Sequence, residues 1–75
     1  MQVERTYDRT WVEMESMLTD AQNKRREWRF LFDRAQRIND RQTMKDAARN
    51  CKALEGVVKT LKWTLGEQGI ESPLE

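Results

Sequence analysis

The sequence contains no histidine, one cysteine, one proline and three glycines among its 75 residues. Without histidine there is no imidazole to act as a general base, to activate a serine or cysteine, or to complete a histidine-containing zinc site. The lone cysteine, Cys51, can form neither an intramolecular disulfide nor a paired-cysteine metal site. We therefore expect no enzymatic activity, no cofactor and no metal ion.

Long apolar runs are absent as well. The first residues are polar and are not followed by an apolar segment like that of a secretory signal. No run approaches the roughly 18 apolar residues that a membrane-spanning helix requires. A single thiol without an export signal is typical of a reducing compartment. The sequence therefore predicts a cytoplasmic protein that does not bind membranes.

Two segments carry apolar residues at alternating intervals of three and four, the pattern of helices that pack along one seam. The N-terminal seam contains Tyr7, Trp11, Met14, Leu18, Ala21, Trp28, Phe32 and Ala35, and Arg25 interrupts it. Met17, Leu31 and Ile38 lie beside this seam and widen it, as a bundle helix requires. The C-terminal seam contains Met44, Ala47, Cys51, Leu54, Val58, Leu61 and Leu65.

The two seams are out of register with each other. If the N-terminal seam continued past residue 39, it would place Gln42, Asp46 and Arg49 at core positions. The apolar residues are instead displaced by two positions, so we predict that the chain doubles back near residue 40. One continuous helix with a slip in register is the alternative.

The expected boundaries follow from the ends of the two patterns. We predict a helical hairpin over residues 1–66, with a helix over about 6–38, a turn over about 39–42, a helix over about 43–65, and a flexible tail over 67–75.

Polar and small residues mark the ends of the second helix. Asn39 or Asp40 is the expected N-cap, and Gln42 follows Asn39 by three residues, as in a capping box. Gly66 follows the last residue of the C-terminal seam, where we expect it to cap the C-terminal end of the second helix.

Two helices that pack only against each other leave much of each seam in water. A large aromatic side chain buries about 150–250 Å², and soluble monomers rarely expose apolar strips of several hundred Å². We therefore predict an all-α fold, an antiparallel two-helix hairpin that dimerises into a four-helix bundle. A different protein partner or a higher oligomer is the alternative. The residues expected in the dimer and core are Trp11, Met14, Leu18, Trp28, Phe32, Leu54, Val58, Leu61 and Leu65.

Charge is unevenly distributed along the chain, although the net charge is only +1. Residues 1–20 carry −3, residues 21–52 carry +6, and residues 53–75 carry −2. A hairpin therefore has a basic turn and an acidic open end. This polarity favours either antiparallel pairing of two hairpins or binding of an anionic ligand at the turn.

Basic residues also align on the outer faces of both predicted helices, away from the seams. Basic side chains neutralise phosphates, and exposed aromatic rings stack on bases. Nucleic-acid binding is therefore the alternative function, beside the simpler interpretation of a solvated charged surface. The residues concerned are Arg26, Arg34 and Arg37 on the first helix, and Lys45, Arg49, Lys52, Lys59 and Trp63 on the second.

Gly56 lies inside the second helix, one heptad before Trp63. A glycine there costs about 0.5–1 kcal/mol relative to alanine, which indicates a close approach. The approaching group is either another chain or the C-terminal tail, folding back through Ile70.

The segment Ala53-Leu54-x-Gly56-Val57-x-x-x-Leu61-x-Trp63-x-Leu65-Gly66 resembles a segment near the end of small helical proteins of phages and prophages. It covers 14 of the 75 residues. The resemblance implies a phage-like genomic setting and a protein of unassigned function. With the two seams, it leads us to predict a non-enzymatic, homo-oligomeric interaction or adaptor module.

Overall fold

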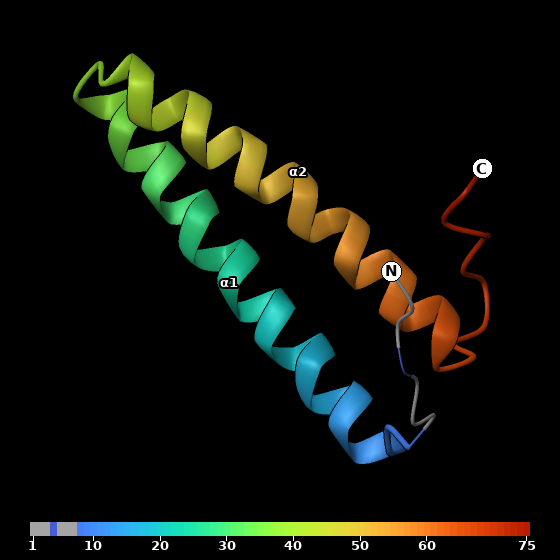
Figure 1. Cartoon of the computed structure of the whole chain (residues 1–75). Helices are drawn as coiled ribbons and strands as arrows, with labels where there is room; N and C mark the ends of the chain where they lie inside the picture. The colour runs from blue at the N-terminus through green and yellow to red at the C-terminus, as the bar shows by residue number, and fades with distance from the viewer. Residues whose placement is uncertain (1–3, 5–7) are drawn as a thin grey trace.

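A computed structural model describes residue 4 and residues 8–75, and the described part forms two helices without any strand. Helix α1 spans Trp11–Arg37 and helix α2 spans Arg41–Thr64. The helices run in opposite directions and pack against each other along their length (Figure 1). The all-helical hairpin is thus confirmed, and a continuous helix through residue 40 is excluded. Neither helix is long and apolar enough to cross a membrane, within the residues that the structure describes.

Helix α1 begins later than the predicted residue 6. Thr10 is its N-cap, and the Thr10 hydroxyl accepts a hydrogen bond of 3.1 Å from the amide of Glu13. The sequence signal for this start is a threonine followed three residues later by a glutamate, and it outweighs the apolar seam that continues upstream. Tyr7, the first residue assigned to that seam, lies outside the described residues.

The turn spans residues 38–40 and is shorter than the predicted 39–42. The amide of Asn39 donates to the carbonyl of Gln36 at 3.3 Å, and the amide of Asp40 donates to that of Ala35 at 2.8 Å. This pair of bonds is a Schellman motif, which requires a left-handed residue after the helix. Asn39 takes that conformation with φ 61°, and asparagine tolerates it better than most residues.

Asp40 is at the same time the N-cap of α2, one of the two residues predicted for this position. Its carboxylate accepts hydrogen bonds from the Thr43 amide at 3.1 Å and from the Thr43 hydroxyl at 2.6 Å. These bonds lower the pKa of the Asp40 carboxyl from its ordinary value of 3.8, and the bond from the Thr43 hydroxyl has the larger effect. The predicted capping box of Asn39 with Gln42 is wrong, because Asn39 closes α1 instead.

Helix α2 ends at Thr64, one residue before the predicted end, in a second Schellman motif. The amide of Gly66 donates to the carbonyl of Trp63 at 3.0 Å, and the amide of Glu67 donates to that of Lys62 at 3.0 Å. Gly66 has φ 77°, so the predicted glycine cap is confirmed. The residues after it contain no helix and return beside α2 (Figure 1).

The core between the helices is made of small side chains. Of the described residues, only Ala21, Ala35, Ala47 and Val58 are buried, and no large side chain is fully buried. The predicted seam residues Met14, Leu18, Trp28, Phe32, Leu54, Leu61 and Leu65 are half-buried. They face the neighbouring helix but still contact solvent, so the hairpin alone leaves its seams incompletely covered.

Trp11 differs from the other seam residues because it is 61% exposed. It is the first residue of α1, and α2 ends at Thr64, so no helical residue of the described chain lies opposite it. Arg25, the interruption in the seam, is half-buried beside Cys51, whose thiol donates to the Arg25 carbonyl at 3.8 Å.

Candidate functional site

A second heptad pattern overlaps the seam on α1 and extends from the helix interface onto one outer side of the hairpin. It consists of Met17, Ala21, Lys24, Trp28, Leu31, Ala35 and Ile38, and the matching positions of α2 are Thr43, Ala47, Asn50, Leu54, Val57 and Leu61. Residues seven apart drift only about 20° around a helix, so each set stays on one side. Met17, Leu31 and Ile38 were expected only as residues that flank the seam, and this repeat was not predicted from the sequence.

Large apolar side chains of this second pattern are open to solvent. Met17 is 58% exposed, Leu31 37%, Ile38 66% and Val57 38%. We call the surface that carries these four residues the Met17 face. Such a strip along a two-helix protein is characteristic of a surface that binds another protein.

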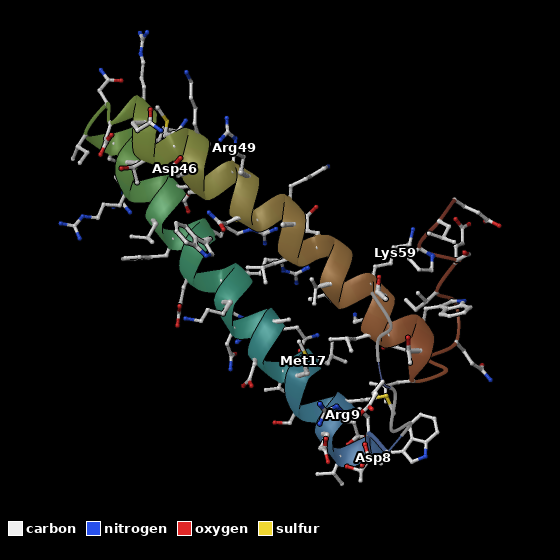
Figure 2. The ribbon with its side chains drawn as sticks, in the orientation of Figure 1. Asp8, Arg9, Met17, Asp46, Arg49 and Lys59 are labelled. Atoms are coloured by element: carbon white, nitrogen blue, oxygen red, sulfur yellow. The ribbon has the colours of Figure 1, made fainter. Side chains whose placement is uncertain are left out.

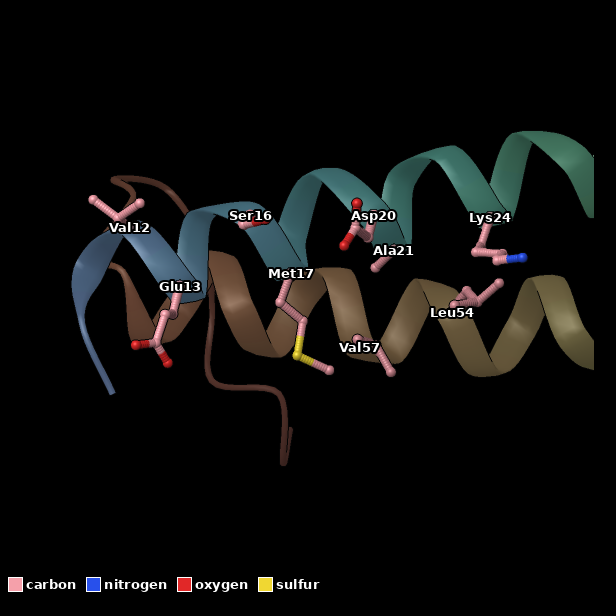
Figure 3. Close-up of a pocket in the computed structure, with 9 residues that line it drawn as sticks. All are labelled: Val12, Glu13, Ser16, Met17, Asp20, Ala21, Lys24, Leu54 and Val57. Atoms are coloured by element: carbon pink, nitrogen blue, oxygen red, sulfur yellow. The ribbon is translucent and has the colours of Figure 1, made fainter. Parts of the chain in front are cut away.

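The Met17 face is hollowed at the open end of the hairpin. A groove of about 640 Å³ lies between the helices, lined by Ala21 and Met17 of α1 and by Leu54 and Val57 of α2. In Figure 3, Met17 extends from α1 toward α2 and Val57 lines the opposite wall, whereas Val12 points away. The groove is therefore shaped by both helices and is mostly apolar.

Two smaller hollows extend the same face. A groove of about 470 Å³ shares Met17 and Val57 with the first and continues to Gly56 and to Pro73 of the tail. Near the turn, Leu31 and Ile38 line a hollow of about 250 Å³. The Met17 face thus has apolar recesses both at the open end of the hairpin and near the turn.

Charged side chains occupy the middle and the rim of this face. Lys24 lies at the centre of the heptad repeat and forms an exposed ion pair with Glu27, with 3.6 Å between Nζ and Oε2. Glu13 and Asp20 border the large groove at the open end, and Arg34 borders the hollow at the turn. Lys24 also lines the large groove and Asp40 also lines the hollow at the turn, so side chains of both signs border each recess.

The predicted basic residues of α2 form one continuous stripe on the outer side of the helix. Lys45, Arg49 and Lys52 are exposed, Lys59 is half-buried, and Trp63 is 52% exposed. Arg49 points away from α1 in Figure 2. The ion pairs found among the described residues involve Arg9, Lys24 and Lys62, so none of these four cations is neutralised by one.

The basic residues of α1 do not join this stripe. Arg26 donates to the side-chain carbonyl of Asn23 at 3.3 Å, and Arg37 donates to the backbone carbonyl of Asp33 at 3.4 Å. Because each helix turns its seam toward the other, the two outer faces point in opposite directions. The structure therefore presents two separate basic surfaces.

Gly56 has no packing partner within the described part of the chain. A Cβ atom built on Gly56 meets nothing within 4 Å, apart from its own helix backbone and immediate neighbours. The tail comes near through Pro73, which lines the same groove, and not through the predicted Ile70. Contact with the tail therefore does not explain the glycine, and the approach of another chain stays a prediction.

We also searched the described residues for clusters of metal-ligating side chains. No group of three or more Cys, Asp and Glu residues in the described ranges could hold a metal ion. Comparisons of the chain with protein-family models, with curated proteins and with solved structures found no match.

Proposed function

We propose that this chain is a non-enzymatic interaction module that works as a homo-oligomer, in which two hairpins bury their Met17 faces against each other in a four-helix bundle. The observation that carries this proposal is the small core: three alanines and one valine are the buried residues among those described. A phage-like genomic setting is proposed on the resemblance of residues 53–66 alone.

Two paired hairpins bury more apolar surface per chain than one hairpin buries alone. Burial of apolar surface contributes about 25 cal/mol per Å², and it must exceed an ordering cost of about 1–2 kcal/mol per residue. Trp28, Phe32, Leu54 and Leu61 are only half-buried in one hairpin. Pairing the Met17 faces moves these side chains toward the middle of a bundle, where both seams are covered.

Sedimentation at micromolar concentration tests the proposal directly. We expect the mass of two chains for the natural sequence. Met17→Glu should weaken the dimer at least about tenfold, because an unpaired carboxylate within an apolar interface is costly. Leu74→Glu is the matched control, since Leu74 is 95% exposed in the tail, and it should leave the dimer intact. A well-folded monomer of the natural sequence would disprove the homo-oligomer.

Nucleic-acid binding is a second candidate function, supported by the basic stripe on α2, whose cations form no ion pair with the residues that the structure describes. Lys59 borders the groove that Met17 and Val57 line, whereas Lys45, Arg49 and Lys52 line none of the grooves of the Met17 face and would stay accessible in a dimer. The test replaces Lys45, Arg49 and Lys52 with glutamine and measures binding to a labelled duplex by fluorescence anisotropy. We expect weaker binding and a salt dependence reduced by about one unit of slope per lost phosphate contact. Absence of binding by the natural sequence at low salt would exclude this function.

A further inference from the structure

We propose that the two hairpins pair end for end, so that the turn of each lies beside the open end of the other. The inference rests on the proposed homo-oligomer and deepens it by naming the orientation and register of the second copy. It would be wrong if the dimer formed with both turns at the same end, an outcome that would leave the proposed function intact.

The register comes from the symmetry of the Met17 face about Lys24. Helix α1 spans Trp11–Arg37, so residue 24 is its midpoint. Met17 and Leu31 each lie seven residues from Lys24, which is about 10.5 Å along a helix. A two-fold axis through this midpoint places Met17 of one copy opposite Leu31 of the other. The exposed side chains of Met17 and Leu31 then each meet an apolar side chain of the partner.

Charges at the centre of the face are compatible with this arrangement. Lys24 is flanked on the same side of α1 by Asp20, one turn before it, and by Glu27, one turn after it. When α1 crosses a second copy of itself in the opposite direction, each Lys24 lies between acidic residues of both copies. Lys24 of each copy then lies near Lys24 of the other, and the carboxylates of Asp20 and Glu27 from both copies offset the repulsion between them.

The ends of the hairpin give the orientation. Residues 21–52, which form the turn half, carry +6, whereas the two segments that meet at the open end carry −3 and −2. The molecule is 46 Å long, far more than the screening length of about 8 Å at physiological salt, so only adjacent ends interact strongly. End-for-end pairing puts opposite charges side by side, and turn-to-turn pairing puts like charges together, which disfavours it.

The two orientations bring different helices into contact. End-for-end pairing places α1 against the partner's α1 across the Met17 face. Turn-to-turn pairing about the long axis places α1 against the partner's α2 instead. Within one chain, Met17 and Val57 line the same grooves and so lie at one level of the hairpin. Turn-to-turn pairing would therefore set Met17 of one copy near Val57 of the other.

Cross-linking between single-cysteine variants distinguishes these arrangements. On a Cys51→Ala background, Met17→Cys, Leu31→Cys and Val57→Cys are prepared separately, with Met17→Cys carrying a terminal tag. Equimolar pairs are exchanged and treated with a short bismaleimide, and the linked heterodimers are resolved by mass. We expect Met17→Cys to link efficiently to Leu31→Cys and poorly to Val57→Cys. Lys24→Cys should link to itself.

Preferential linking of Met17→Cys to Val57→Cys would overturn the end-for-end orientation while the homodimer stands. A dimer in which neither pair links would show that the Met17 face is not the interface, and the inference would fail. A monomer by sedimentation would contradict both this inference and the proposed function, so the two failures are separable.

Salt provides an independent measurement of the orientation. For end-for-end pairing, raising NaCl from about 0.05 M to about 0.5 M should increase the dimer Kd several-fold, because it screens the attraction between opposite ends. A Kd that falls with salt would indicate that like charges are adjacent, and the proposed orientation would be wrong.

Discussion

The turn half and the open half of the hairpin are packed to different degrees. Ala35 and Ala47, near the turn, are 2% and 0% exposed, and Figure 1 shows the two ribbons nearer to each other there than at the open end. At the open end, Ala21 and Val58 are 7% and 4% exposed, but a groove of about 640 Å³ remains beside Ala21. Small side chains let two helices approach closely, so the turn half closes by itself while the open half leaves room for a partner.

Enlarging one alanine in each half is the change with the largest expected effect. Ala47→Leu adds atoms where no space exists, and we expect a loss of about 1–3 kcal/mol in the free energy of unfolding. Ala21→Leu adds the same atoms at a buried residue that also lines the open groove, so it should cost less than Ala47→Leu. Urea unfolding at one fixed chain concentration measures both. Equal losses would show that the halves are packed alike.

The two Schellman motifs offer a second comparison, because one joins the helices and the other only ends α2. Asn39→Ala places an alanine at φ 61°, a backbone conformation that alanine adopts less readily than asparagine. We expect a loss of about 1–2 kcal/mol in the free energy of unfolding. Gly66→Ala meets the same restriction at φ 77°, but fraying of the last turn of α2 relieves it. Thermal unfolding should show the larger loss for Asn39→Ala. Asn39→Gly, which keeps the conformation accessible, should be nearly neutral.

Gly56→Ala should change folding and association in opposite directions. Because the added Cβ meets nothing within 4 Å in the hairpin, the substitution should stabilise α2 by about 0.5–1 kcal/mol. If another chain approaches closely at Gly56, the dimer should dissociate more readily in sedimentation. Stabilisation with unchanged association would assign the glycine no role in the interface.

The smallest expected effect is a pH dependence of the turn. The pKa of Asp40 is lowered by its bonds to Thr43, so its stabilising contribution is present above the ordinary value of 3.8 and is lost as the pH falls through the lower folded value. The difference in Tm between the natural sequence and Asp40→Asn should shrink between about pH 5 and about pH 2. Asp33→Asn, an exposed residue of α1, is the control for removing one charge.

Much of the fold was predictable because local rules decided it. The displaced seams indicated the reversal near residue 40, and Gly66 and Asp40 took the predicted cap positions. The start of α1 was missed because an apolar seam was preferred to the Thr10 and Glu13 signal. Asn39 was misassigned because a capping residue and a left-handed residue look alike in sequence, and only the hydrogen bonds distinguish them.

The candidate site was less predictable, because exposure is a property of the packed pair. Met17, Leu31 and Ile38 are visible in the sequence as apolar residues beside a seam, but the pattern does not say how far the neighbouring helix covers them. Met17, flanking the seam, and Met14, on the seam, differ only in their position around α1, yet Met14 is half-buried and Met17 is 58% exposed.

The sequence by itself determined two amphipathic helices, their reversal and the opposite charges of the two ends, since periodicity, cap chemistry and charge are written along the chain. Only the tertiary structure decided which alanines became the core, which apolar side chains stayed outside, and where the grooves opened. The reason is geometric, because the width of contact between two helices depends on their separation and rotation, which arise when both surfaces pack together.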